Sequence, residues 1–294
     1  MLSEAVGSLP ERGIRLWLRL FGRRVARSDY LWLSNPAGPK GQIGEALYES
    51  IATAEGLVVR KASAGDGLLP DFEALRGPDF DPSKVDRRIR DFYEHSTSYR
   101  LEAWSETSLL TRGFLWFLVT FVSRRIDQLN FPMSGMETSR GITSEIIKLV
   151  LPGTGKVVHT GWLRKATSSG RVIYAGLYSA SAPGAYPGPC VKVSFPLPLG
   201  NSTVFLRPEA QADGSLKLIS AGKKFGDPGY YRVLDEGKAT LKVRNLRSLH
   251  ELFHVYVDTD GYLRTDHSVR FMGLNILRLH YKMTAVEALP YAAP

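Results

Sequence analysis

The run His250-Glu251-Leu252-Phe253-His254 contains the residue types that hold a catalytic zinc ion in one class of hydrolase. On a helix, the two imidazoles would lie one turn apart on the same face and bind the metal together. The glutamate between them would act as the general base toward a zinc-bound water. Asp260 and His267 follow at places where a third ligand is conceivable. The run therefore makes a zinc-dependent hydrolase one functional hypothesis.

The neighbouring residues favour a β-strand for the same run. Two β-prone segments, 253–258 and 262–265, flank Thr259-Asp260-Gly261, and Asp-Gly between such segments is typical of a hairpin. On a strand, His250 and His254 would lie about 13 Å apart, at roughly 3.3 Å per residue, which is too far to share one zinc ion. We therefore expect a hairpin with no metal and no cofactor, and keep His250, Glu251 and His254 as metal ligands only under the hydrolase alternative.

A second group of polar residues lies near the end of the chain, in Asp266-His267 and His280-Tyr281. Side chains alternate in character there: one parity holds Val269, Phe271, Leu277, Leu279, Tyr281 and Met283, and the other holds Arg270, Arg278, His280 and Lys282. If the apolar parity packs on helices, the charged parity faces water. If the sheet curls into a cup with charged residues inside, they can hold an anionic head group or position an acid-base histidine.

From this group we take His267, His280 and Asp266 as candidate catalytic residues. Tyr281 and Arg278 are candidate ligand-binding residues from the same strands. The sequence leaves open whether binding is accompanied by a reaction, because no nucleophile-elbow or P-loop pattern occurs.

The segments that must position these residues are short strands. Turn residues separate runs with β periodicity, and the expected strands are 142–151, 157–166, 171–181, 191–197, 203–208 and 216–221. Such regular spacing without intervening helices predicts an antiparallel sheet, half-barrel or barrel over residues 141–294.

Residues 1–140 predict helices instead. Helices are expected over 43–54, from 81 through the stripe Val85, Ile89, Phe92 and Tyr93, and over 109–129. The last of these is apolar almost all round, so we expect it to be buried and to cover the sheet. Trp116 and Phe117 on it are therefore candidate ligand-binding residues. The fold class is α+β, with the helical part packed on or capping the sheet as one integrated unit.

The beginning of the chain combines apolar and basic residues at helical spacing. Ile14, Trp17, Leu18, Phe21 and Val25 recur on one face, with arginines over much of the remainder. Residues 12–27 can therefore lie on an anionic membrane surface, or pack on the protein with the arginines in water. A peripheral membrane or scaffold protein without catalysis is the third hypothesis.

The net charge, the length of the apolar runs and the single cysteine limit which partners and which cellular location we expect. The formal net charge is +9, which favours anionic partners, but no specific nucleic-acid signature accompanies it. The longest apolar run, 113–122, is shorter than the roughly 20 residues that cross a bilayer. With a single cysteine and no recognisable signal peptide, we expect a cytoplasmic protein, at most peripheral to a membrane.

Several blocks in roughly the last seventy residues resemble an uncharacterised bacterial protein family. They are 225–231, 254–258, 263–267 and 277–281. The resemblance implies no function. Our leading expectation therefore comes from the residues: a β-cup capped by helices that binds an apolar or amphiphilic small molecule, such as a lipid or biosynthetic intermediate.

Overall fold

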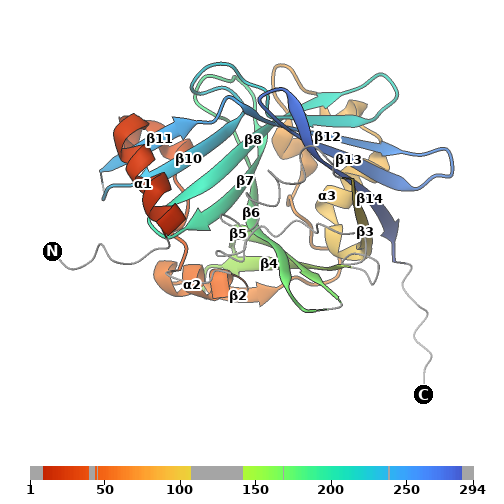
Figure 1. The fold of residues 1–294 in the computed structure, drawn as a ribbon. Helices are drawn as coiled ribbons and strands as arrows, with labels where there is room; N and C mark the ends of the chain where they lie inside the picture. The colour runs from red at the N-terminus through yellow and green to blue at the C-terminus, as the bar shows by residue number, and fades with distance from the viewer. Residues whose placement is uncertain are drawn as a thin grey trace.

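Antiparallel strands dominate the chain (Figure 1). A computed structural model describes residues 9–39, 44, 46–106, 142–167, 169–237 and 239–286. The α-helices are α1 (Leu9–Phe21), α2 (Ala46–Glu55) and α3 (Arg87–Glu94), and short 3-10 helices cover Arg27–Leu33, Phe72–Leu75, Pro82–Lys84 and Ser96–Ser98. The strands are β1 (Arg23–Ala26), β2 (Val58–Lys61), β3 (Tyr99–Glu106), β4 (Ile142–Val150), β5 (Val157–Ala166), β6 (Val172–Ser181), β7 (Cys190–Leu197), β8 (Gly200–Ala210), β9 (Leu216–Ile219), β10 (Tyr230–Asp235), β11 (Thr240–Asn245), β12 (Leu249–Val257), β13 (Leu263–Phe271) and β14 (Leu274–Ala285).

Within the described residues these strands form one sheet of 14 strands. Its main path runs β2-β4-β5-β6-β7-β8-β9-β12-β13-β14-β3, and β10, β11 and β1 branch from β8. The long strand β8 allows this branch, because its first part pairs with β10 and its last part, Arg207–Ala210, pairs with β9. The sheet curls until β3 lies close to β4, but among the described residues no hydrogen-bonded ladder joins these two strands. The α+β class is confirmed with a large open sheet, and the expected barrel or half-barrel is not.

The period-2 patterns in the sequence correctly predicted where the strands of the second half lie, apart from differences at their ends. The expected strand 157–166 is β5, and the other five expected strands are β4 and β6–β9 with shifts at their ends. β12 and β13 form the expected hairpin, with Val257 opposite Leu263 across a turn in which Gly261 has a positive φ of 84°. Asp258 stabilises this turn by accepting hydrogen bonds from the backbone N–H groups of Asp260 and Tyr262.

The expected separation of a helical first part from a β second part is not confirmed. Strands β1, β2 and β3 all precede residue 140 and join the sheet. In β3, buried Leu101 and Ala103 alternate with exposed Glu102 and Trp104, and the strand pairs with β14. The alternation within β3 is short, and the strand is part of the sheet through its pairing with β14, which lies far along the chain. The expected helix 109–129 and the expected boundary after residue 140 lie outside the described residues.

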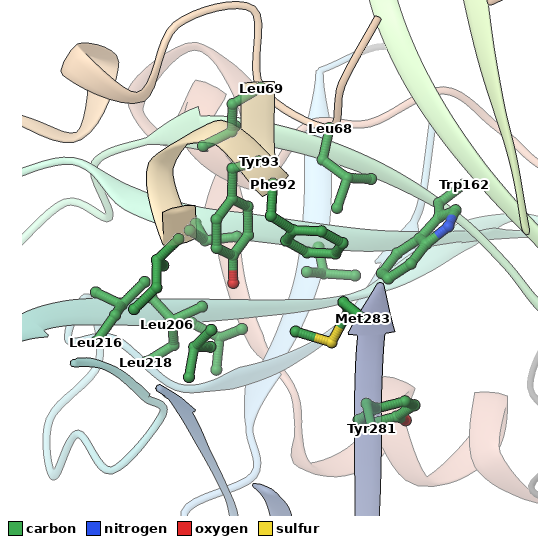
Figure 2. Close-up of a cluster of buried hydrophobic side chains, with 14 of the residues drawn as sticks. Leu68, Leu69, Phe92, Tyr93, Trp162, Leu206, Leu216, Leu218, Tyr281 and Met283 are labelled. Atoms are coloured by element: carbon green, nitrogen blue, oxygen red, sulfur yellow. The ribbon is translucent and has the colours of Figure 1, made fainter. Parts of the chain in front are cut away.

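Helices cover the sheet on different sides. α2 packs on β4–β6 through Leu47, Tyr48 and Ile51, so these strands are buried on both faces. α3 lies against the inner, concave side, and its expected apolar stripe is confirmed, because Ile89, Phe92 and Tyr93 are all buried there. Figure 2 shows Phe92 and Tyr93 projecting from α3 into the core, where they meet side chains such as Leu206, Trp162 and Met283 from strands far apart in the sequence.

Candidate functional site

The concave side of the sheet encloses a cavity of about 110 Å³. Strands β3–β8, β10 and β12–β14 contribute its wall, and Leu68 with Phe92 and Tyr93 of α3 covers part of it. Most lining side chains are aliphatic or aromatic. The polar groups that face the cavity are few: Arg164, Glu251, Thr265, His267 and a set of tyrosines. An apolar enclosure with a few convergent polar groups is the usual form of a small-molecule site.

Arg164 is the one arginine or lysine that lines this cavity among the described residues. It lies on β5 two residues after Trp162, so the strand period places both side chains on the inner face. The guanidinium carbon lies 3.7 Å from the centroid of the Trp162 ring and 4.9 Å from that of Tyr281. Arg164 is only 8% exposed, and its Nε has no hydrogen-bond partner in the part of the chain that the structure describes. The aromatic rings thus stabilise the cation while leaving a donor unused.

His267 and Glu251 form a second polar pair in the cavity, from the adjacent strands β13 and β12. The His267 Nε2 lies 3.3 Å from a Glu251 carboxylate oxygen, without the alignment of a hydrogen bond. The imidazole stacks on Phe253, with ring centroids 3.7 Å apart and planes 13° from parallel. Its Nδ1 is buried and accepts or donates no hydrogen bond among the residues that the structure describes. The pair therefore combines an oriented imidazole with a nearby carboxylate, the residue types of general acid-base chemistry.

Tyrosines supply most of the remaining polar lining. Burial raises the pKa of both Tyr178 and Tyr230 to about 12. It also raises the pKa of Tyr174 well above its ordinary value. These phenols are therefore neutral at physiological pH, where they can donate a hydrogen bond to a bound molecule but cannot act as anions.

The structure places the other predicted residues of β13 and β14 on the opposite, outer face. His280 lies directly across from Asp266 in the ladder, and its Nδ1 is 2.6 Å from the Asp266 carboxylate. His280 also stacks on Trp104, and Arg278 is exposed. Of the predicted catalytic residues, only His267 lines the cavity, together with the predicted ligand-binding residue Tyr281. The apolar residues that alternate along β13 and β14 face the cavity. The charged residues between them therefore face outward and do not line a cup.

The run 250–254 lies within strand β12, as its neighbours predicted. Glu251 faces the cavity, whereas His254 binds Ser215 through its Nε2, 3.0 Å from the hydroxyl oxygen, and His250 contacts the Ser220 carbonyl. The helical arrangement on which the hydrolase alternative depends is therefore not present. Within the described ranges, no three His, Cys, Asp or Glu side chains come close enough together to hold a metal ion.

Two predicted ligand-binding residues, Trp116 and Phe117, lie outside the described residues. Sequence reasoning missed Arg164, Trp162, Tyr174 and Tyr178. The signal available for them was strand parity: Trp162 and Arg164 share one parity in β5, and Tyr174 and Tyr178 share one in β6. Parity alone does not say which face of a strand looks into a cavity, and both faces of these strands are buried.

A second notable surface is formed by helix α1. Leu18 is buried against the sheet, whereas Leu16, Trp17, Leu20 and Phe21 are exposed, with Leu20 at 66%. Their spacing places these four side chains on one side of the helix. The helix is held beside β11 by bonds from Lys242 and Arg244 to backbone carbonyls of the helix, and exposed Arg19, Arg23 and Arg24 lie close in sequence. Figure 1 shows α1 on the outside of the molecule, beside β10 and β11.

Comparison with known proteins gives one informative relative. The chain is 28% identical over 225 residues to the uncharacterised membrane protein YndJ of Bacillus subtilis, an alignment that covers 75% of this chain and 38% of that protein. A resemblance to an uncharacterised bacterial protein is thus confirmed, and it extends well beyond the last seventy residues. No family model matches, and no solved structure does. None of the described helices combines the length and apolarity needed to cross a membrane.

Proposed function

We propose that the protein binds a small apolar or amphiphilic molecule in the cavity on the concave side of the sheet. The cavity itself carries the proposal. At about 110 Å³ it approaches the roughly 150 Å³ of an engineered apolar cavity that takes up benzene. The enclosed part therefore accommodates one ring or a short chain. Chemical conversion by His267 stays a prediction.

The lining of the cavity supports this proposal. Most of its side chains are aliphatic or aromatic, so an apolar molecule that enters removes their surface from water. Arg164, Glu251 and His267 supply a few polar groups that can orient the polar end of such a molecule.

The cavity can be tested with tryptophan reporters. In protein labelled with 5-fluorotryptophan, hexan-1-ol is expected to shift the ¹⁹F signal of Trp162, which lines the cavity, in a saturable manner. The signals of Trp17 and Trp104, which lie on exposed surfaces, should stay in place. Replacing Ala103 with leucine fills part of the cavity and should weaken binding at least tenfold. The Trp116 signal tests in the same titration whether that residue also contacts the ligand.

Glu102→Leu provides a matched control for the cavity-filling variant. It introduces the same side chain on the same strand, but Glu102 points to the exposed outer face. Binding of hexan-1-ol should therefore match that of the unaltered protein. Equal weakening by both variants, or no saturable shift of the Trp162 signal in any of them, would contradict the proposal.

A second function has its own support: docking of α1 on an anionic membrane surface. The exposed apolar side of α1 beside arginines has the composition of helices that lie in a membrane interface. The relative in Bacillus subtilis is named a membrane protein. In this proposal Trp17 and Phe21 insert between lipids while the nearby arginines pair with anionic head groups. It is compatible with the cavity proposal, because α1 does not line the cavity.

The membrane proposal predicts cosedimentation with vesicles. The protein should pellet with vesicles that contain phosphatidylglycerol, and salt should weaken this binding because it screens the arginines. The double change Leu20→Ser and Phe21→Ser should reduce binding at least tenfold. Met272→Ser with Leu274→Ser is the control, because these two exposed apolar residues lie at the β13–β14 turn. If the α1 variant binds as the unaltered protein does, the proposal is wrong.

A further inference from the structure

We propose that the cavity recognises an organic acid, with the ligand carboxylate paired to Arg164 and its apolar part against the aromatic wall. The inference rests on the proposed ligand-binding function and adds the chemical class of the ligand. Its basis is a buried cation that lacks an anionic partner.

The surroundings of Arg164 show what is missing. Arginine keeps its positive charge in proteins, and burying such a charge is strongly unfavourable unless it is paired. Among the described residues, no carboxylate oxygen lies within 4.0 Å of the Arg164 guanidinium, and the carboxylate of Glu251 lies 3.3 Å from His267 Nε2. The contacts of the guanidinium with Trp162 and Tyr281 are to ring faces, which attract the cation but accept no hydrogen bond in its plane.

The shape of the guanidinium indicates the kind of acceptor. Arg164 lines the cavity, and a guanidinium presents its N–H groups in a planar fork that matches a carboxylate. A carboxylate is also small enough for a cavity of about 110 Å³, leaving room for an apolar part. Phe195, Leu279 and Met283 are among the apolar side chains of the wall that can contact that part.

Two ligands of equal chain length separate this inference from the parent proposal. Hexanoate and hexan-1-ol are titrated separately into 5-fluorotryptophan-labelled full-length protein, and binding is followed by the ¹⁹F signal of Trp162. We expect hexanoate to bind at least tenfold more tightly than hexan-1-ol. Arg164→Met should weaken hexanoate binding on the order of 10- to 100-fold, as expected for loss of a charge-assisted hydrogen bond, and change hexan-1-ol binding less than about threefold.

Two further variants make the test decisive. Arg164→Gln removes the charge but keeps a polar side chain that can donate hydrogen bonds, so it should also abolish the preference for the acid. It replaces the methionine variant if that one does not fold. Lys165→Gln removes a positive charge from the next residue of β5, whose side chain points to the other face, and should leave the preference intact.

Each outcome bears on one of the two proposals. Equal affinities for hexanoate and hexan-1-ol in the unaltered protein, or an unchanged preference in both Arg164 variants, would overturn the organic-acid inference and leave the cavity function standing. An equal loss of preference in Lys165→Gln would overturn it too, because general surface charge would then explain the effect. No shift of the Trp162 signal with either ligand would overturn both proposals.

Discussion

Replacing Gly161 with alanine is expected to lower the free energy of unfolding by about 3 kcal/mol, the upper range for overpacking a core. A Cβ atom at this position would lie 2.2 Å from Cε1 of Tyr48 and 2.8 Å from its Cδ1. Tyr48 is fully buried, and its hydroxyl donates to the carbonyl of Trp162 at 2.8 Å. The ring of Tyr48 therefore has nowhere to move without giving up this bond.

The expected sign is opposite to the intrinsic preference of the backbone. Glycine within a strand is normally less favourable than alanine by roughly 0.5–1 kcal/mol, so alanine would stabilise β5 if the space were free. Urea unfolding of both proteins measures the difference. Gly13→Ala in α1 is the control, because nothing lies within 4 Å of a Cβ there, and a slight gain in stability is expected.

A double variant shows whether the clash is the cause. Tyr48→Leu removes the ring that a Cβ at Gly161 would meet, at its own cost in packing and hydrogen bonding. In that background Gly161→Ala should cost much less than in the unaltered protein. An equal cost in both backgrounds would contradict the proposed contact between Gly161 and Tyr48.

Replacing Lys192 with methionine is expected to stabilise the protein at pH 7, by about 2 kcal/mol. Lys192 is 7% exposed on β7, and its Nζ donates to the carbonyl of Ser34 at 3.2 Å. Burial lowers the pKa of this amine from 10.5 to about 8. A pKa shift of this size corresponds to a penalty of about 3 kcal/mol for burying the charged amine. The variant avoids this penalty but loses the hydrogen bond to Ser34, which contributes about 1 kcal/mol.

The effect depends on pH in a direction fixed by the lowered pKa. Between pH 8 and 10.5 the unfolded chain still binds the proton that folded Lys192 has released, so the stability contribution of Lys192 rises with pH across this window. Below about pH 8 the penalty is fully present. The advantage of Lys192→Met over the unaltered protein should therefore be largest at pH 7 and disappear by about pH 10.5.

Urea unfolding at pH 7, 8.5 and 10 compares the two proteins. Lys61→Met controls for removal of a lysine from an exposed strand position and should change the free energy of unfolding at pH 7 by less than about 0.5 kcal/mol. Destabilisation by Lys192→Met at every pH would show that the bond to Ser34 outweighs the burial of the charge.

The amino-acid sequence by itself determined the local elements of this protein. Period-2 patterns and turn residues placed strands β4–β9, and Asp260-Gly261 predicted the β12–β13 hairpin that rules out a helical zinc motif. The stripe that ends in Phe92 and Tyr93 predicted α3. These features depend on residues close together in the chain, so local propensity and turn geometry are sufficient to specify them.

Only the tertiary structure decided which side chains meet. Strand β3 pairs with β14, and the alternation seen in its described side chains covers only Leu101 to Trp104. His267 shares the parity of Val269 on β13, whereas His280 belongs to the charged parity of β14, but only the curl of the sheet shows which parity faces a cavity. Arg164 was indistinguishable from a surface arginine until both faces of β5 were covered, one by α2 and one by the cavity wall. The physical reason is that burial and curvature are collective properties of many strands, whereas a sequence pattern fixes only the alternation within each one.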